Sequence, residues 1–151
     1  MSVKDAELRV YVHSTESEEK VMRAIENVVG SDILSTAEVR VENATGHYGN
    51  NIKIITIKVK NNNAEQLLNR ILSKLGKADL LALSSTLEER VDKEGTLFFR
   101  LSKQDAFRGD LVLYEADDVI HVSIGFQGRR KKALTEYQEA LKRAADKGAD
   151  S

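Results

Sequence analysis

Segments in which every second residue is apolar, as in strands, alternate along this chain with segments in which apolar residues recur at helical spacing. The order of these segments limits the possible folds more than any other feature of the sequence. Apolar and polar residues alternate from Leu8 to His13, which is typical of a strand with one buried face. Strand character recurs in later segments, namely residues 37–41, 52–60, 96–101, 119–126 and, as a short strand, 111–114. The polar loop after residue 41 is expected to join two of these strands into a hairpin.

Apolar residues recur at helical spacing between the strands. Thr15 and Glu18 form a capping box at the start of a helix that ends at Gly30. Asn63 is predicted to cap a second helix, whose apolar stripe ends before Gly76. Two further helices are expected over residues 79–91 and 131–145, and residues 103–109 form a polar connection or a helical turn.

This order, β-α-β-β-α-α-β-(β)-β-α, predicts an α+β fold. We expect a two-layer sandwich in which the helices cover one face of a mostly antiparallel sheet. The 151 residues contain no internal repeat, no low-complexity segment and no linker that would separate two units. A single domain is therefore expected over residues 1–151, with an ordered core over residues 6–145.

The composition excludes several classes of protein. The chain contains no cysteine, which rules out disulfides and thiolate metal sites. Its first residues lack the apolar core of a secretion signal, and its apolar stretches are too short to span a bilayer, so we expect a cytoplasmic protein. The net charge of −1 argues against a generally basic nucleic-acid-binding surface, although residues 126–151 carry seven Lys and Arg against four Asp and Glu.

Sequence signatures of catalysis are lacking. The three histidines, His13, His47 and His121, do not show metal-ligand spacing, and neither a nucleophile elbow nor a phosphate-binding glycine loop occurs. We therefore expect no enzyme activity, no metal and no cofactor. Two alternatives stay open: His13 and His121 could lie close together on neighbouring strands, and His47 or His121 could serve a hydrolase or nuclease.

Three local clusters have the composition of an RNA contact. In the loop Gly46–Asn50, two glycines frame His47 and Tyr48, and both rings can stack on an unpaired base. Lys103 and Arg108 lie in a segment that surrounds one phenylalanine with hydrogen-bond donors. The third cluster places four cations at the start of a helix, where they oppose the helix dipole: Arg129, Arg130, Lys131 and Lys132.

Strand alternation predicts a fourth feature, on the face of the sheet away from the helices. If Leu8, Val10 and Val12 point toward the helices, the residues between them point away. The residues assigned to this outer face are Arg9, Tyr11, His13, Arg40, Phe98, Arg100, His121 and Ser123. Aromatic rings beside cationic groups are typical of open sheets that bind single-stranded RNA. The same face would equally suit contact with a second subunit, or simple exposure to solvent.

Four segments together resemble a family of small archaeal proteins described as RNA-binding proteins or predicted exosome subunits. These segments are Gly46–Asn50, Leu87–Asp92, Lys103–Phe107 and Asp118–Val122, the last followed by a Gly-Arg-Arg stretch. The resemblance extends over residues 8–141. It implies a two-layer fold similar to that of the ribosomal protein that contacts the smallest ribosomal RNA. It also implies RNA as a partner, with exosome or ribosome-related proteins as further partners, and it transfers no catalytic residue.

The leading hypothesis is therefore a non-enzymatic RNA-binding protein, accessory to the exosome or to ribosome-related RNA metabolism. The resemblance transfers only the loop around His47 and Tyr48 and the segment 103–108 as candidate contacts. The main alternative is a protein-interaction or dimerisation module, such as a homodimer, that makes no contact with RNA. The near-neutral net charge favours this alternative.

Overall fold

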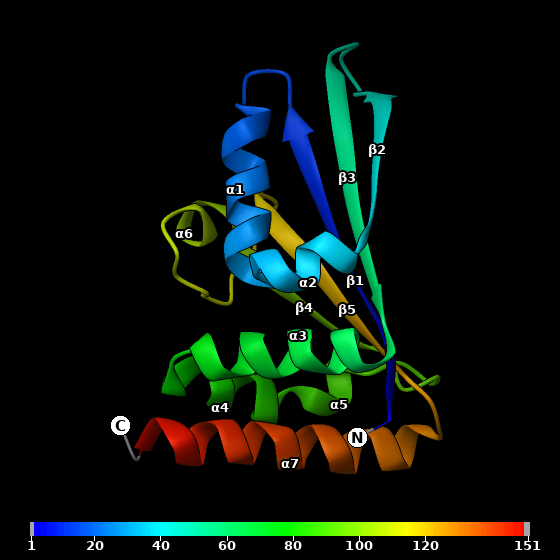
Figure 1. Cartoon of the computed structure of the whole chain (residues 1–151), viewed down its shortest axis with the longest axis vertical. Helices are drawn as coiled ribbons and strands as arrows, with labels where there is room; N and C mark the ends of the chain where they lie inside the picture. Colours follow the sequence, from blue (N-terminus) through cyan, green and yellow to red (C-terminus); the bar gives the residue numbers. More distant parts are fainter. Residues whose placement is uncertain (1, 150–151) are drawn as a thin grey trace.

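A five-stranded antiparallel sheet with helices packed against it forms the core of the computed structural model, which describes residues 2–149 (Figure 1). The strands are β1 (Val3–His13), β2 (Glu38–Thr45), β3 (Asn51–Lys60), β4 (Leu97–Ser102) and β5 (Val119–Phe126). The helices are α1 (Glu18–Val29), α2 (Ser31–Thr36), α3 (Asn61–Lys74), α4 (Lys77–Ser85), α5 (Leu87–Arg90), α6 (Lys103–Phe107) and α7 (Arg130–Ala149). The predicted α+β class is confirmed.

The strands follow the order β2-β3-β1-β5-β4, and every neighbouring pair is antiparallel. β1 therefore lies at the centre of the sheet, while β2 and β4 form its two edges. The predicted hairpin of β2 and β3 is confirmed. The predicted strand 111–114 is reduced to an isolated bridge between Leu113 and Leu101, because the chain there follows β4 only briefly before turning away.

The core lies between the sheet and the helices. Alternation along β1 buries Leu8, Val10 and Val12, as expected for a strand whose other face is open. Their side chains belong to one contiguous apolar cluster with residues such as Ile25 of α1 and Leu67 of α3. Each fully buried side chain of this kind contributes about 1.5–3 kcal/mol of transfer free energy. No helix within residues 2–149 is apolar and long enough to cross a bilayer.

The start of α1 differs from the predicted capping box. Ser17 is the N-cap residue, and its hydroxyl accepts a hydrogen bond from the backbone N–H of Lys20 at 3.3 Å. Thr15 precedes the helix because Glu16 closes a turn, in which its backbone N–H donates to the carbonyl of His13 at 2.9 Å. The predicted end at Gly30 is confirmed, since this residue has a φ of +86°, a conformation that favours glycine.

Two other helix boundaries were also predicted wrongly. Asn63 does not cap α3, which already begins at Asn61; its side-chain amide instead donates to the hydroxyl of Thr36 at 3.1 Å. The helix expected over residues 79–91 is broken at Thr86, where the backbone leaves the helical region and separates α4 from α5. The apolar residues on both sides of the break still face the core, so their spacing did not reveal it.

Candidate nucleic-acid interface

Five side chains form a row across the whole sheet, on the face opposite the core. Following the strand register from β2 to β4, the aligned residues are Arg40, Thr56, Arg9, His121 and Arg100. Aligned residues of neighbouring strands point to the same face, so three arginines and one histidine lie along one line. We call these five residues the cationic row. The predicted outward orientation of Arg9, Arg40 and Arg100 is confirmed, since all three are exposed.

Aromatic rings lie directly beside the cationic row. The ring of Tyr11 meets the ring of His121 edge-on, with centroids 5.9 Å apart. Phe98, which is aligned with Ser123, is 48% exposed and opens onto the same face. The face therefore combines two aromatic side chains with guanidinium groups, as single-stranded nucleic acid binding requires.

The pKa of the His121 imidazole depends on burial and on the two arginines aligned with it. Partial burial lowers the pKa of His121, and the positive charges of Arg100 and Arg9 lower it further. The ring is therefore largely neutral at pH 7. A neutral ring can stack on a base or form hydrogen bonds, and it gains a charge if an anion binds nearby.

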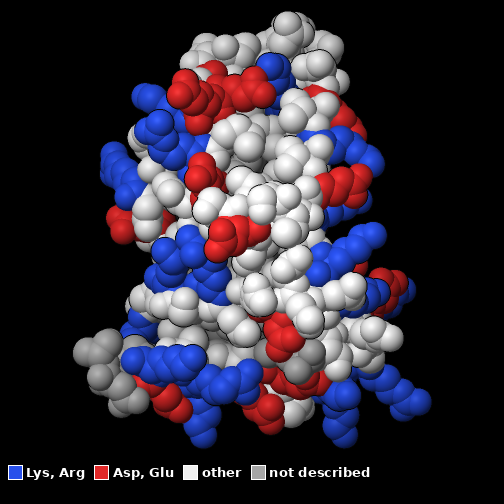
Figure 2. Space-filling model, viewed as in Figure 1, with Lys and Arg blue, Asp and Glu red and all other residues white. Residues whose placement is uncertain are grey.

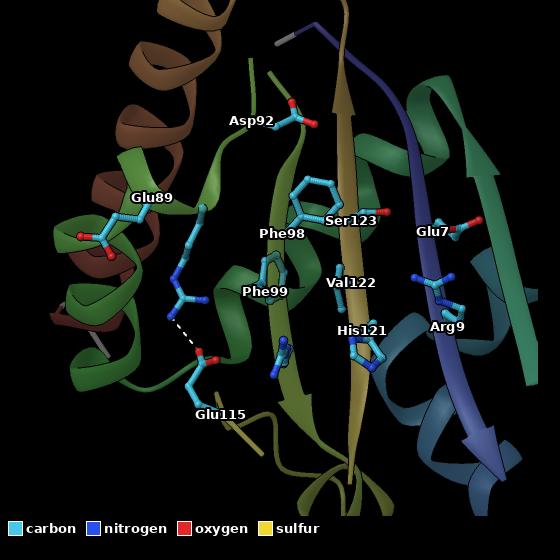
Figure 3. Close-up of a pocket in the computed structure, with 12 residues that line it drawn as sticks. Glu7, Arg9, Glu89, Asp92, Phe98, Phe99, Glu115, His121, Val122 and Ser123 are labelled. Carbon is cyan, nitrogen blue, oxygen red and sulfur yellow. Dashed lines mark hydrogen bonds and ion pairs between the residues drawn. The ribbon is translucent and has the colours of Figure 1, made fainter. Parts of the chain in front are cut away.

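A pocket with a volume of about 440 Å³ lies on this face between β1 and the β4 edge (Figure 3). Arg9, His121 and Ser123 line it from β1 and β5, and Phe98 and Arg100 from β4. Its outer wall is the ion pair between Arg90 and Glu115, whose atoms lie 2.8 Å apart. The acidic side chains that also line it are Glu7, Glu89 and Asp92. The volume is that of an ordinary small-ligand site, so one nucleobase fits.

The two predicted loop residues lie away from this pocket, at the tip of the β2–β3 hairpin (Figure 1). Tyr48 is 93% exposed, and its ring contacts that of His47 edge-on with centroids 5.0 Å apart. The turn is closed by the N–H of Gly46, which donates to the carbonyl of Asn50, and by Gly49 with a φ of +80°. The glycines thus serve the turn, while both rings stay available to a ligand.

The predicted contact Lys103 is instead a buried structural residue, with only 3% of its surface exposed. Its ammonium group donates to the carbonyl of Tyr11 at 2.8 Å and lies 2.8 Å from the Asp118 carboxylate and 3.1 Å from that of Glu16. These partners occupy its three donors, so Lys103 has no donor left for a ligand. Arg108, at the end of the same segment, is exposed.

The four cations before and within α7 also differ in role. Arg130 donates from Nη2 to the carbonyl of Glu88 at 2.8 Å and from Nε to that of Val91 at 3.3 Å, and so closes the C-terminal end of α5. The other three, Arg129, Lys131 and Lys132, are exposed. Lys132 lies 4.0 Å from Glu136, one turn along α7. This cluster lies at the opposite end of the molecule from the hairpin tip (Figure 1).

The structure therefore does not unite the predicted contacts in one surface. The cationic row, with Tyr11, forms the largest group, while the hairpin tip, Arg108 and the start of α7 lie elsewhere. On the face shown in Figure 2, acidic and basic side chains are interspersed. The pocket also includes Glu89, Arg90 and Glu115. The sequence did not assign these three residues to a binding site, because they reach the pocket from α5 and from the loop before β5.

The alternative of a paired-histidine site is contradicted by the strand register. His121 is aligned with Arg9, whereas His13 lies four residues further along β1, opposite Ile52. Four residues of strand span about 13 Å, which is too far for a shared ligand. Within the described part of the chain, no three His, Asp or Glu side chains are grouped to hold a metal ion.

Comparison with known proteins identifies the family. Residues 5–126 match the family model described as RNA binding. The chain is 33% identical over 139 residues to an RNA-binding protein of Pyrococcus abyssi, an alignment that covers 91% of this chain and 87% of the relative. It is 29% identical over 123 residues to an uncharacterized protein of Methanocaldococcus jannaschii, covering 80% and 82% of the two chains.

Solved structures agree with this assignment. A crystal structure from Sulfolobus solfataricus, assigned to the family DUF54, superposes with a TM-score of 0.79 at 29% identity and covers 92% of this chain and 98% of that one. A DUF54 protein from Methanothermobacter thermautotrophicus gives 0.77 at 25% identity, with coverage of 93% and 99%. The chain therefore belongs to the RNA binding family, whose relatives named here come from archaea.

Proposed function

We propose that this protein binds RNA without catalysing a reaction on it, and that the open sheet face holds a single-stranded segment. The observation that carries this proposal is the cationic row, in which three arginines span all five strands beside Tyr11 and Phe98. Guanidinium groups pair with phosphates through two parallel hydrogen bonds, and exposed rings accept stacked bases. Both contacts suit an unpaired strand better than a duplex, whose bases are already stacked.

The charge distribution explains how a protein with a net charge of −1 can bind RNA. Affinity would come from a short line of cations and from stacking, and not from a broad basic field. The carboxylates of Glu7, Glu89 and Asp92 in the pocket repel phosphates but accept hydrogen bonds from base amino groups. A base in the pocket, with its phosphates along the cationic row, satisfies both kinds of group.

Fluorescence anisotropy with labelled single-stranded and duplex RNA tests the proposal. We expect Arg9→Glu and Arg100→Glu to weaken binding of the single strand and to reduce the slope of log affinity against log salt by about 0.7 for each lost phosphate contact. Phe98→Ala should cost about 1 kcal/mol or more, roughly fivefold in affinity. Lys74→Glu, an exposed charge reversal in the last turn of α3, is the matched control.

Two results would contradict the proposal in different ways. If the wild-type protein binds no RNA at low salt, the function itself is wrong. If it binds RNA but the Arg9 and Arg100 variants behave like Lys74→Glu, RNA occupies another surface. The hairpin tip is then tested by Tyr48→Ala, and the start of α7 by Arg129→Glu, because both residues are exposed.

We also propose that the protein works in the cytoplasm beside the exosome or ribosome-related complexes. The resemblance of the sequence to predicted exosome subunits is the support for this association. Affinity purification from native cells, with and without nuclease treatment, tests it. Exosome or ribosomal proteins recovered only without nuclease indicate a link through RNA, and recovery in both samples indicates direct contact. If neither sample contains them, the association is wrong.

A further inference from the structure

The two edges of the sheet differ in whether another segment of the chain forms hydrogen bonds with them. Along the β4 edge, the backbone N–H of Ser102 donates to the carbonyl of Val112 at 2.8 Å, and the N–H of Tyr114 donates to that of Arg100 at 3.1 Å. The chain after α6 thus covers this edge. Along the β2 edge, in the part of the chain that the structure describes, no strand or bridge pairs with the outer side of β2.

β2 is well suited to pair with another strand. It is eight residues long, its register with β3 has no bulge, and its side chains are exposed except for Ala44. Val39 and Val41 are 46% and 47% exposed and point to the same side as the core residues Ile57 and Ile55. Figure 1 shows this strand at the margin of the sheet. Proteins commonly protect such an edge with proline, a bulge or a covering element, and the described chain uses none of these on β2.

The hairpin turn determines which backbone groups of β2 face outward. The N–H of Gly46 donates to the carbonyl of Asn50, so these two residues form a hydrogen-bonded pair. In an antiparallel ladder such pairs recur every second residue. The even-numbered residues of β2 therefore bond to β3, and Val39, Val41 and Asn43 direct their N–H and C=O groups toward the free edge.

We propose that β2 pairs with β2 of a second copy of this chain, in an antiparallel dimer centred on Val41. In this register, Val41 faces Val41 of the partner subunit in a hydrogen-bonded pair, and Arg40 faces Glu42 of the partner subunit in the adjacent, closer pair. The two-fold axis generates the same Arg–Glu pair twice. The dimer joins the two sheets into one, with the helices of both copies on the same side.

Charge complementarity selects this register over its neighbours. In a pair centred on Arg40, the two copies of Arg40 face each other. In a pair centred on Glu42, the two copies of Glu42 face each other. Each of these registers therefore brings like charges together. Centring the pair on Val39 also pairs opposite charges, but it leaves the part of β2 after Arg40 without a partner strand. The register centred on Val41 pairs opposite charges and uses nearly the whole strand from Glu38 to Thr45.

Arg40 can change from the ion pairs within its own strand to an ion pair with Glu42 of the partner subunit. Its guanidinium lies 3.5 Å from Glu38 and 3.8 Å from Glu42 of its own strand, in ion pairs that are more than half exposed. Such exposed pairs stabilise little, so their rearrangement toward the partner costs little. The dimer does not depend on RNA, and its formation is measured without RNA.

Analytical ultracentrifugation over a range of protein concentrations provides the first test. We expect a reversible transition to twice the monomer mass of 16.8 kDa. Arg40→Glu and Glu42→Arg should each raise the dissociation constant about tenfold, because both Arg–Glu pairs become like-charge pairs. The double variant Arg40→Glu/Glu42→Arg reverses both charges and should restore the dimer, with circular dichroism verifying that each variant is folded.

Single cysteines test the register, because the chain has no cysteine of its own. In Val41→Cys, the two Cα atoms of a hydrogen-bonded pair lie about 5.5 Å apart, within the range that a disulfide spans. Mild oxidation should therefore crosslink this variant. In Val39→Cys the two copies are offset by four residues, about 13 Å, and should stay uncrosslinked. A wild-type protein that remains monomeric at high concentration, single charge variants that still dimerise fully, or faster crosslinking through Val39→Cys would each overturn the proposal.

Discussion

Lys103 and Asp118 are joined by an ion pair of 2.8 Å in which only the carboxylate reaches solvent. The lysine lies at the start of α6, and the aspartate immediately precedes β5. The same ammonium group donates to the carbonyl of Tyr11 and to Glu16, so one side chain connects the end of β1, the approach to α1 and the β4–β5 region. A buried ammonium needs such partners because it has lost its hydration.

Replacing Lys103 with Met should therefore destabilise the fold without removing an RNA contact. The carboxylates of Glu16 and Asp118 and the Tyr11 carbonyl would lose their shared donor. Since both carboxylates are partly exposed, we expect a loss of about 2 kcal/mol in the free energy of unfolding, below the range for fully buried pairs. Urea denaturation measures the stability, and anisotropy measures binding by the folded variant. A stable variant that loses RNA binding would restore Lys103 as a contact.

The Asp118 carboxylate should make stability depend on pH in the acid range. Burial alone raises the pKa of Asp118, but hydrogen bonds from Lys103 and Gln104 and the charge of Lys103 outweigh this and lower the pKa below the ordinary 3.8. A lowered folded-state pKa contributes stability above the unfolded value, and this contribution is lost as the pH falls through the folded value.

Asp118→Asn should consequently lower the free energy of unfolding at pH 7, by less than about 1 kcal/mol because the side chain is 45% exposed. The difference from the wild type should shrink below pH 3.8, where the wild-type carboxyl becomes protonated in the unfolded and then in the folded state. Asp117→Asn changes the exposed neighbouring carboxylate and is the control. An equal effect of both substitutions, or a difference that does not change with pH, would contradict this account. Urea denaturation at several pH values provides the measurement.

Most of the fold could be predicted because the local patterns of apolar residues mark the same faces that tertiary packing buries. The alternation in β1 and the apolar stripe of α3 describe buried faces that the structure also shows. The errors occur where a tertiary contact decides the outcome. Asn63 is a good capping residue by type, yet its side-chain amide donates to the hydroxyl of Thr36, which lies 27 residues earlier in the chain. This contact forms only once the fold has brought α2 beside α3, so the local sequence does not reveal it.

The candidate site was less predictable than the fold. Strand alternation correctly oriented Arg9 and Arg100, because the side-chain period of a strand is fixed. It could not align them into one row, since alignment depends on strand order and register. Charge and local composition also failed to distinguish the exposed Arg129 from Arg130. The guanidinium of Arg130 donates hydrogen bonds to carbonyls that lie about forty residues earlier in the chain.

That difference between the two arginines can be measured directly. Arg130→Ala removes both hydrogen bonds at the C-terminal end of α5 and should cost about 1 kcal/mol of unfolding free energy, which lowers Tm by about 2–4 °C in a chain of this size. Arg129→Ala is the matched control, and as an exposed substitution it should remain within about 0.5 kcal/mol of the wild type. Calorimetry of the two variants compares them. Equal melting temperatures would show that the Arg130 contacts contribute no net stability.

Binding of RNA at the cationic row should depend on pH through His121. The pKa of His121 is lowered in the free protein, first by burial and then by Arg100 and Arg9. A phosphate beside the ring favours the imidazolium and raises this pKa in the complex. By linkage, affinity should therefore increase as the pH falls through the pKa of the complex, and the increase should end below the pKa of the free protein.

His121→Gln keeps a polar side chain at this position but removes the titration. We expect the affinity of the wild type to rise by several fold between pH 7.5 and pH 5.5, while that of His121→Gln changes little. His47→Gln, at the hairpin tip, should retain the wild-type profile, because RNA held on the sheet face does not contact this ring. Anisotropy titrations at constant ionic strength measure the three profiles. If His47→Gln flattens the profile and His121→Gln does not, the hairpin tip holds the phosphate, and the cationic row does not.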